Sequence, residues 1–162
     1  MEDDVPSIIV PIRHSDKVVE IFIDEFPDDV ENGGLLTLLA QEVAPLHIWH
    51  KFAVEYYRQG RVDAFRLILS EAREGFSYFE AEISKDDVQG KREFNESRLL
   101  ILNALCADLI TTFIEERNKA RADELNTQIV EMLSQVRPLL LHFLANSACK
   151  ERPRKCPSSS FL

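Results

Sequence analysis

Glycine, proline and cysteine are all scarce in this chain of 162 residues, which has 5 glycines, 7 prolines and 3 cysteines. So few turn-forming residues favour long helices over a fold of many short strands. The cysteines Cys106, Cys149 and Cys156 show no paired spacing, so no disulfide framework is expected. Cys106 lies in an apolar helical stretch and is predicted to be a reduced core residue.

Long apolar runs and an excess of basic charge are also missing. The longest apolar runs, residues 99–102 and 139–141, fall far short of the ~20 residues that span a bilayer. The first four residues carry three acids where a signal peptide needs positive charge. We therefore expect a soluble intracellular protein without membrane contact.

The net charge of −9 is concentrated near the N-terminus, where residues 1–31 hold 10 acids and 2 bases. Phosphate repels an acidic chain, so direct nucleic-acid binding is not expected. This acidic N-terminal segment could attract a basic partner, although a solvated terminus is the simpler interpretation.

No motif for catalysis or for phosphate binding occurs in the sequence. A glycine-rich phosphate loop, a serine nucleophile elbow and a zinc-protease helix motif are all missing. His47 and His50 flank Trp49, but no cysteine or acidic residue stands at ligand spacing, so both are predicted to be structural or surface residues. We expect a protein that is not an enzyme and that uses no cofactor, metal or small-molecule substrate.

The C-terminal region offers two weak candidate sites. His142 with Cys149 and Cys156 matches no common zinc spacing. A basic cluster between Lys150 and Lys155, which includes Arg152 and Arg154, could act as a nuclear-import peptide or a nucleic-acid patch. Residues 146–162 show no periodicity, and the preferred interpretation of both candidates is a disordered tail.

The first element that the sequence predicts is a β-hairpin. Apolar residues alternate with polar ones on both sides of a polar turn at residues 13–17, and Pro11 suits an edge strand. Because a lone hairpin is only marginally stable, it must pack on the helices behind it or pair with another chain. The possible strand-edge contacts to a partner are Ile8, Val10, Ile12, Val19, Ile21 and Ile23.

After turn residues at 27–29 and 32–34, a short helix is expected at 35–43, followed by two helices that face each other. Apolar residues recur at helical spacing from residue 49 to residue 56 and again from 62 to 73, on either side of Gly60. This pattern predicts an αα-hairpin of the tetratricopeptide type, with small alanines where helices approach. The signature residues are Trp49, Phe52, Ala53, Tyr56, Gly60, Phe65, Leu69 and Ala72. Phe65 departs from the usual small residue at its position.

Residues 79–95 are polar and predict a loop or short helix, with a capping motif from Ser84 to Asp87. A long apolar helix capped by Asn95 is expected at 96–117, and a second at 121–136. Pro138 is expected to break that helix before a short one at 139–145. The predicted fold is mainly α: a β-hairpin extension at 1–34, helical repeats at 35–145 and a tail at 146–162.

Three stretches resemble a known family. They are residues 8–27, which contain Val-Pro-Ile-Arg and end in Phe-Ile-Asp-Glu-Phe-Pro, the string Leu-His-Ile-Trp at 46–49, and Glu-Tyr-Tyr-Arg-Gln-Gly at 55–60. Together they are similar to the N-terminal region of the tetratricopeptide scaffold subunit of the Paf (RNA polymerase II-associated factor) complex. The similarity continues weakly to about residue 136 and stops at Pro138. Family members have many more repeats, so the resemblance implies a truncated product with an unrelated tail.

The resemblance implies a nuclear scaffold. That family's complex travels with elongating RNA polymerase II and promotes histone ubiquitination and methylation, and its N-terminal repeats dock the Paf subunit. The residues themselves leave two alternative functions open. One is a generic adaptor that captures chaperone-type peptide C-termini, for which Lys51 and Arg58 would be the available cations. The other is a fragment without function.

Overall fold

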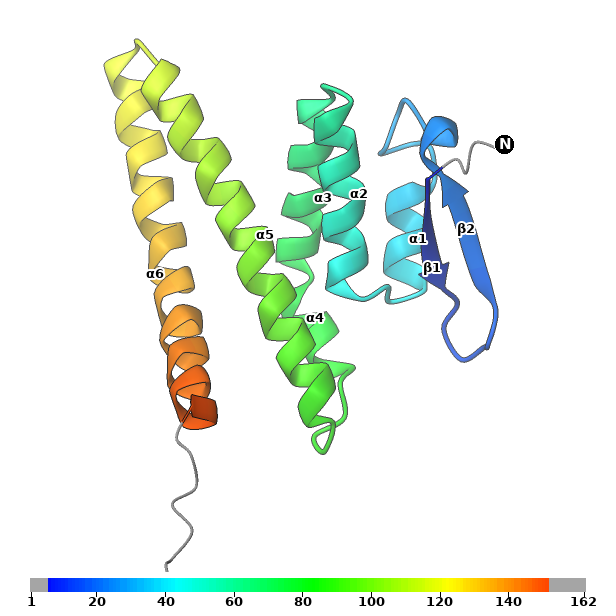
Figure 1. The fold of residues 1–162 in the computed structure, drawn as a ribbon. Coiled ribbons are helices and arrows are strands. Elements are labelled where there is room, and N and C mark those ends of the chain that lie inside the picture. Colours follow the sequence, from blue (N-terminus) through cyan, green and yellow to red (C-terminus); the bar gives the residue numbers. More distant parts are fainter. Residues whose placement is uncertain (1–5, 152–162) are drawn as a thin grey trace, which may run out of the picture.

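The structure is a computed structural model that describes the backbone of residues 6–151 and the side chains of residues 6–145. Within that range an antiparallel β-hairpin precedes six α-helices, which confirms the predicted fold class (Figure 1). The elements are β1 (Ser7–Pro11), β2 (Val18–Phe22), a 3-10 turn (Ile23–Glu25), α1 (Leu35–Gln41), α2 (Leu46–Arg58), α3 (Val62–Glu74), α4 (Phe76–Ala81), α5 (Val88–Glu115) and α6 (Lys119–Glu151).

The β-hairpin packs one face on the helices. Ile8 pairs with Ile21 and Val10 with Val19, so the alternating apolar residues share a face. Ile8 and Val10 are buried, and β1 contacts α2. The opposite face carries the exposed residues Ile9 and Val18. The hairpin is thus supported by the helical unit, one of the two arrangements that its small size requires.

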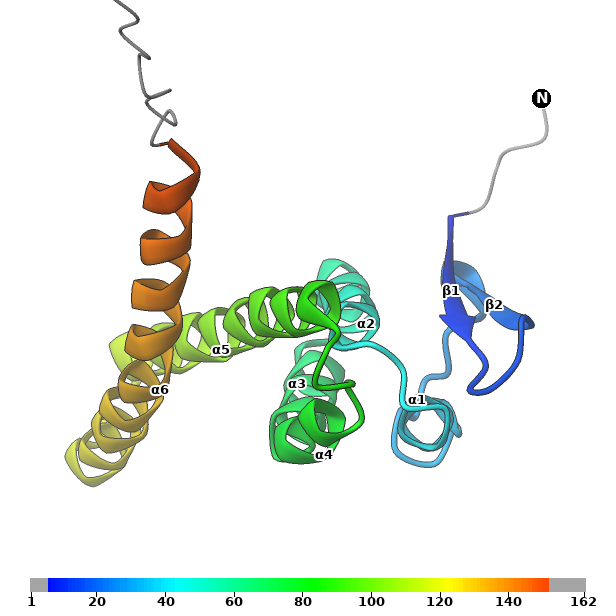
Figure 2. The same ribbon diagram turned by 90° about the horizontal axis from the view of Figure 1, so that it is seen from below.

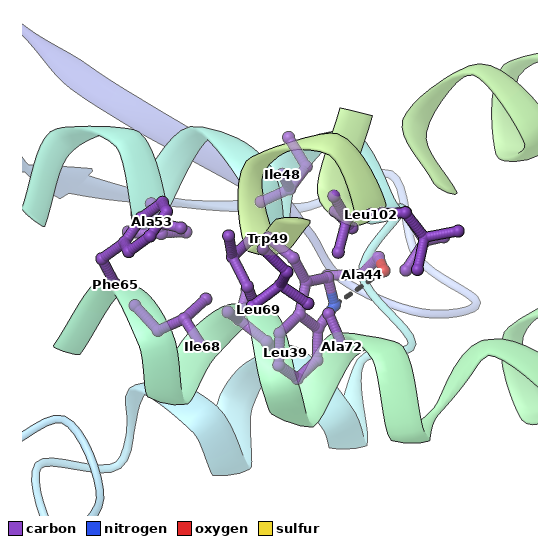
Figure 3. Close-up of a cluster of buried hydrophobic side chains, with 14 of the residues drawn as sticks. Leu39, Ala44, Ile48, Trp49, Ala53, Phe65, Ile68, Leu69, Ala72 and Leu102 are labelled. Atoms are coloured by element: carbon purple, nitrogen blue, oxygen red, sulfur yellow. Dashed lines mark hydrogen bonds between the residues drawn. The ribbon is translucent and has the colours of Figure 1, made fainter. Parts of the chain in front are cut away.

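The helices α2 and α3 form the predicted αα-hairpin, and the turn between them explains the need for Gly60. Gly60 has φ +76°, and its N–H donates to the Tyr57 carbonyl while the Arg61 N–H donates to the Tyr56 carbonyl. This is a Schellman turn, in which the left-handed residue is usually glycine. The apolar faces of both helices meet in the core around Trp49 (Figure 3).

The turn after α1 has the same form with an unusual residue. The expected helix at 35–43 ends at Gln41, because Val43 adopts φ +48°. The Ala44 N–H donates to the Leu39 carbonyl, and the Val43 N–H to the Ala40 carbonyl. Val43 therefore occupies the position that Gly60 holds after α2. A left-handed conformation costs an ordinary residue roughly 1–2 kcal/mol, and β-branched residues adopt it rarely.

The polar stretch at 79–95 is more helical than expected. It contains the end of α4 and the first turns of α5, so the long helix starts at Val88 and not at residue 96. The cap is Asp87, whose carboxylate accepts from the Gly90 N–H at 2.8 Å, whereas Asn95 lies inside the helix. Side-chain pairs Gln89–Glu93 and Arg92–Glu96, each four residues apart, support these extra turns despite Gly90.

Pro138 does not end a helix, which corrects the prediction of a break at that residue. The helix α6 continues through it to Glu151, and Figure 2 shows the axis of α6 changing direction between its first and second halves. Proline removes one helical hydrogen bond, here the one to the carbonyl of Ser134. Both Ser134 and Pro138 are exposed, so water can replace the lost partner. Residues 146–151, expected in a disordered tail, are helical, and residues 152–162 lie outside the described range.

The helix α5 is the central element of the repeat unit. It packs on α2 and α3 on one side and on α6 on the other, and Figures 1 and 2 show α6 lying beyond it. By length and composition alone α5 could cross a membrane. Because an apolar composition is also what a core helix needs when neighbours cover two of its sides, this composition is weak evidence for a membrane span.

Candidate protein-interaction site

The repeat-signature side chains build the core and do not form a binding surface. All of the signature side chains are buried: those of Trp49, Phe52, Ala53, Tyr56, Phe65, Leu69 and Ala72. The Trp49 indole N–H donates to the Ala44 carbonyl at 3.2 Å, which ties α2 to the preceding turn. Phe65, the departure from the usual small residue, packs its ring 5.1 Å from that of Tyr57. Partner contacts must therefore come from other residues.

The segment after the hairpin is fixed to the repeat by contacts that the periodicity did not reveal. The Phe26 ring lies 5.1 Å from Tyr56 and 5.2 Å from Phe52. The Tyr56 hydroxyl donates to the Pro27 carbonyl at 2.9 Å, and Arg61 donates to the same oxygen at 2.5 Å. Burial raises the pKa of Tyr56. The hairpin and the repeat thus behave as one unit.

The hairpin has two outer edges, and the register identifies the backbone groups on each. The Ile12 N–H donates to the Lys17 carbonyl and the Ile23 N–H to the Pro6 carbonyl. Antiparallel hydrogen-bonded pairs alternate, so the even-numbered residues of β1 face β2. The outward groups are then those of Ser7, Ile9 and Pro11 on β1, and of Val18, Glu20 and Phe22 on β2.

The outer edge of β2 is the more open one. Within the described residues, the outward backbone groups of both strands lack a hydrogen-bond partner outside the hairpin, but β1 is the strand that contacts α2. Figure 1 places β1 on the side of α1 and β2 at the outside of the molecule. Among the residues predicted as strand-edge contacts, Ile8 and Val10 are buried against the helices, and the others are partly buried. Pairing with a partner would use the backbone of β2, with these side chains holding the strand in place.

The helical unit is joined across α3 and α5 by a two-pronged ion pair. Arg66 on α3 donates to both carboxylate oxygens of Asp108 on α5, at 2.7 and 2.9 Å.

The two cations considered for capturing the carboxylate of a peptide C-terminus are poorly arranged for that role. Arg58 is paired with Glu55 on its own helix, while Lys51 is exposed. A clamp built from Lys51 and Arg58 would have to break that pair.

Titratable side chains do not assemble a metal centre in the part of the chain that is described. No group of three or more potential metal ligands occurs there. Burial lowers the pKa of His47 and of His50, and Lys51 lowers that of His47 further. Burial raises the pKa of Cys106, as expected of an inert core thiol. The side chains of Cys149 and Cys156, and the basic cluster from Lys150 to Lys155, lie outside the described residues.

Comparison with known proteins supports the resemblance. The chain is 33% identical over 101 residues to "Protein CTR9 homolog" of Arabidopsis thaliana, which covers 62% of this chain and 8% of that protein. It is 43% identical over 76 residues to "RNA polymerase-associated protein CTR9" of Caenorhabditis elegans, 44% of this chain and 6% of that one. No protein-family model matches. The chain thus resembles a part of CTR9 that is less than a tenth of its curated relatives' length.

Proposed function

We propose that the chain is a scaffold module without catalytic activity that acts in a Paf-type complex on RNA polymerase II in the nucleus. The observation that carries the proposal is the 33–43% identity to CTR9 proteins, one of which is named as RNA polymerase-associated. The tetratricopeptide-like hairpin supports it, because stacked αα-hairpins provide extended surfaces for other proteins. Transcription elongation and co-transcriptional histone modification are then the processes in which the module acts, through the other subunits.

The proposal predicts that the tagged chain, expressed in cells, co-purifies with Paf-complex subunits and RNA polymerase II from nuclear extract. The control is Trp49→Asp, which places a charge in the buried centre of the hairpin and destroys the fold. Recovery of neither subunits nor polymerase, from a chain whose helical circular-dichroism spectrum is intact, would refute the proposal.

We propose further that a partner strand pairs with the outer edge of β2, where it would add main-chain hydrogen bonds to the sheet. The matched variants are Glu20→Pro and Ile9→Pro, because these residues lie directly opposite each other and both N–H groups point outward. Each substitution removes one outward donor from the same hairpin, on opposite edges.

Glu20→Pro is expected to reduce recovery of the Paf subunit at least about tenfold, equivalent to ~1.4 kcal/mol or more, and Ile9→Pro to leave it unchanged. Thermal unfolding of both variants shows whether the hairpin is retained. Equal losses for the two variants, or none for either, would exclude pairing at this edge while leaving the scaffold proposal in place.

A further inference from the structure

A pocket of about 440 Å³ lies where three distant parts of the sequence meet. Its walls come from the end of the hairpin, from the connection between α1 and α2, and from the region where α4 ends and α5 begins. Figure 1 shows these three segments at the same end of the molecule. Apolar side chains such as Val43, Phe79 and Phe94 form much of the lining. The volume lies within the ~300–1,000 Å³ that ligand pockets usually have.

Two residues of the lining, Val43 and Ser97, bear on what the pocket could hold. Val43 holds a left-handed conformation that glycine would adopt without strain, and the valine side chain forms part of the pocket wall. Ser97 is 6% exposed as a residue and lines the pocket. In the pocket wall its hydroxyl is available as a donor and acceptor for a bound group.

The rim of the pocket is acidic. Arg13 forms an ion pair with Glu82, and the Arg13 backbone N–H donates to Glu42 at 2.8 Å. Glu93 accepts from the Gln89 amide at 2.7 Å. Glu42 and Glu93 therefore have polar partners but no cationic one among the described residues.

The histidine on the rim does not compensate for these carboxylates. His47 lines the pocket, and burial together with Lys51 lowers its pKa against an opposing effect of Glu93. The lowered pKa favours the neutral imidazole. His14 at the hairpin end is exposed. The rim thus has three glutamates, Glu42, Glu82 and Glu93, and one arginine, Arg13, which is paired with Glu82. Its net charge is therefore negative.

We propose that this pocket binds an extended peptide of a partner protein, which inserts one large apolar side chain and sets a lysine or arginine against Glu42 and Glu93. The apolar walls would receive the side chain, and the Ser97 hydroxyl would meet a polar group of the peptide backbone. The cation would supply the partner that the two carboxylates lack. The inference rests on the proposed function only in taking a protein as the ligand.

The test uses the purified chain and an immobilised positional-scanning peptide library, in which each position is varied independently. We expect selection of a large apolar residue with lysine or arginine beside it. The selected peptide is then labelled, and its affinity is measured by fluorescence polarisation for three variants. Glu93→Lys replaces one negative charge of the rim with a positive one, and Ser97→Leu fills the pocket. Glu71→Lys makes the same charge change at an exposed position on α3 outside the pocket lining.

Glu93→Lys and Ser97→Leu are each expected to weaken the peptide at least about tenfold, and Glu71→Lys less than about twofold. Circular dichroism checks the fold of Ser97→Leu, and the exposed Glu93→Lys keeps the test valid if that variant unfolds. A library that selects nothing, selects acidic neighbours or selects apolar residues regardless of charge would overturn the proposal. So would unchanged binding by Glu93→Lys. None of these outcomes affects co-purification with Paf-complex subunits, which tests the proposed function separately.

Discussion

Replacing Trp49 with phenylalanine tests how the αα-hairpin is held to the segment before it. The indole is 2% exposed, and its N–H donates to the Ala44 carbonyl at 3.2 Å. Phenylalanine cannot make that bond, and Ala44 is itself only 1% exposed. Leaving a buried acceptor without a partner costs about 1–3 kcal/mol, and the smaller ring leaves a void that adds about 1 kcal/mol. We expect a total loss of about 2–4 kcal/mol.

Urea unfolding followed by far-ultraviolet circular dichroism measures this loss. Trp49 is the chain's single tryptophan, so its replacement removes the usual fluorescence signal. For a chain of this size, 1 kcal/mol shifts the melting temperature by roughly 2–4 °C, so a fall of about 4–16 °C is expected. The matched control is Tyr57→Phe, because Tyr57 is 56% exposed on the same helix. Its effect should stay within about 0.5 kcal/mol.

The two variants together give a decisive result. If Trp49→Phe were as mild as Tyr57→Phe, the indole would be neither buried nor hydrogen-bonded to the turn before α2. The assignment of residues 46–74 as a packed helical pair would then lose its main support. A large loss in both variants would instead point to general fragility of the helix α2.

Three further predictions follow from single features of the structure. Gly60→Ala should lower the free energy of unfolding in urea by roughly 1–2 kcal/mol, because a backbone φ of +76° is strained for alanine. No loss would mean that the turn relaxes. A double-mutant cycle on Arg66→Ala and Asp108→Ala should give a coupling of about 0.5–1 kcal/mol, modest because Arg66 is partly exposed; zero coupling would remove this link between α3 and α5. Burial lowers the pKa of His50, so the unfolded chain binds the proton more readily, and stability should fall as the pH drops below about 6.5. His50→Gln should flatten that part of the pH profile, and an unchanged slope would refute the assignment.

The helical core was predictable because it depends on local patterns. Apolar residues at helical spacing and a glycine at the turn were enough to define α2 and α3 within about three residues. The start of α5 was misplaced by eight residues, because the polar stretch with Gly90 is typical of a loop. Its helical state depends on the Asp87 cap and on side-chain pairs four residues apart, which add small stabilising terms that composition does not reveal.

Pro138 shows the limit of a local rule. Proline inside a helix usually ends or bends it, and the sequence favoured an end. In the structure α6 continues, since the freed carbonyl of Ser134 is on an exposed turn where water can hydrogen-bond to it. In α6 the side that carries Ser134 and Pro138 faces solvent. That orientation is fixed by packing on α5, which the sequence alone does not give.

The candidate interaction surfaces were harder to predict than the fold. The alternating residues of the hairpin gave its register, but not which edge stays open, because that depends on where α1 and α2 lie. The pocket joins residues from position 11 to position 97, and no spacing within one segment indicates it. The conformation of Val43 was equally hidden, since a β-branched residue is a poor choice for a left-handed turn.

The residues that make the chain resemble CTR9 and the residues that would contact a partner are different sets. Strings such as Leu-His-Ile-Trp at 46–49 and Glu-Tyr-Tyr at 55–57 are largely repeat core, where Trp49 and Tyr56 are buried. A disruptive substitution at a buried position such as Trp49 or Tyr56 unfolds the scaffold and abolishes every interaction, so it cannot identify a binding site. Exposed positions at the β2 edge and at the pocket rim, such as Glu20 and Glu93, leave the core intact. Loss of binding from a variant at either position would therefore report contact with a partner and not collapse of the fold.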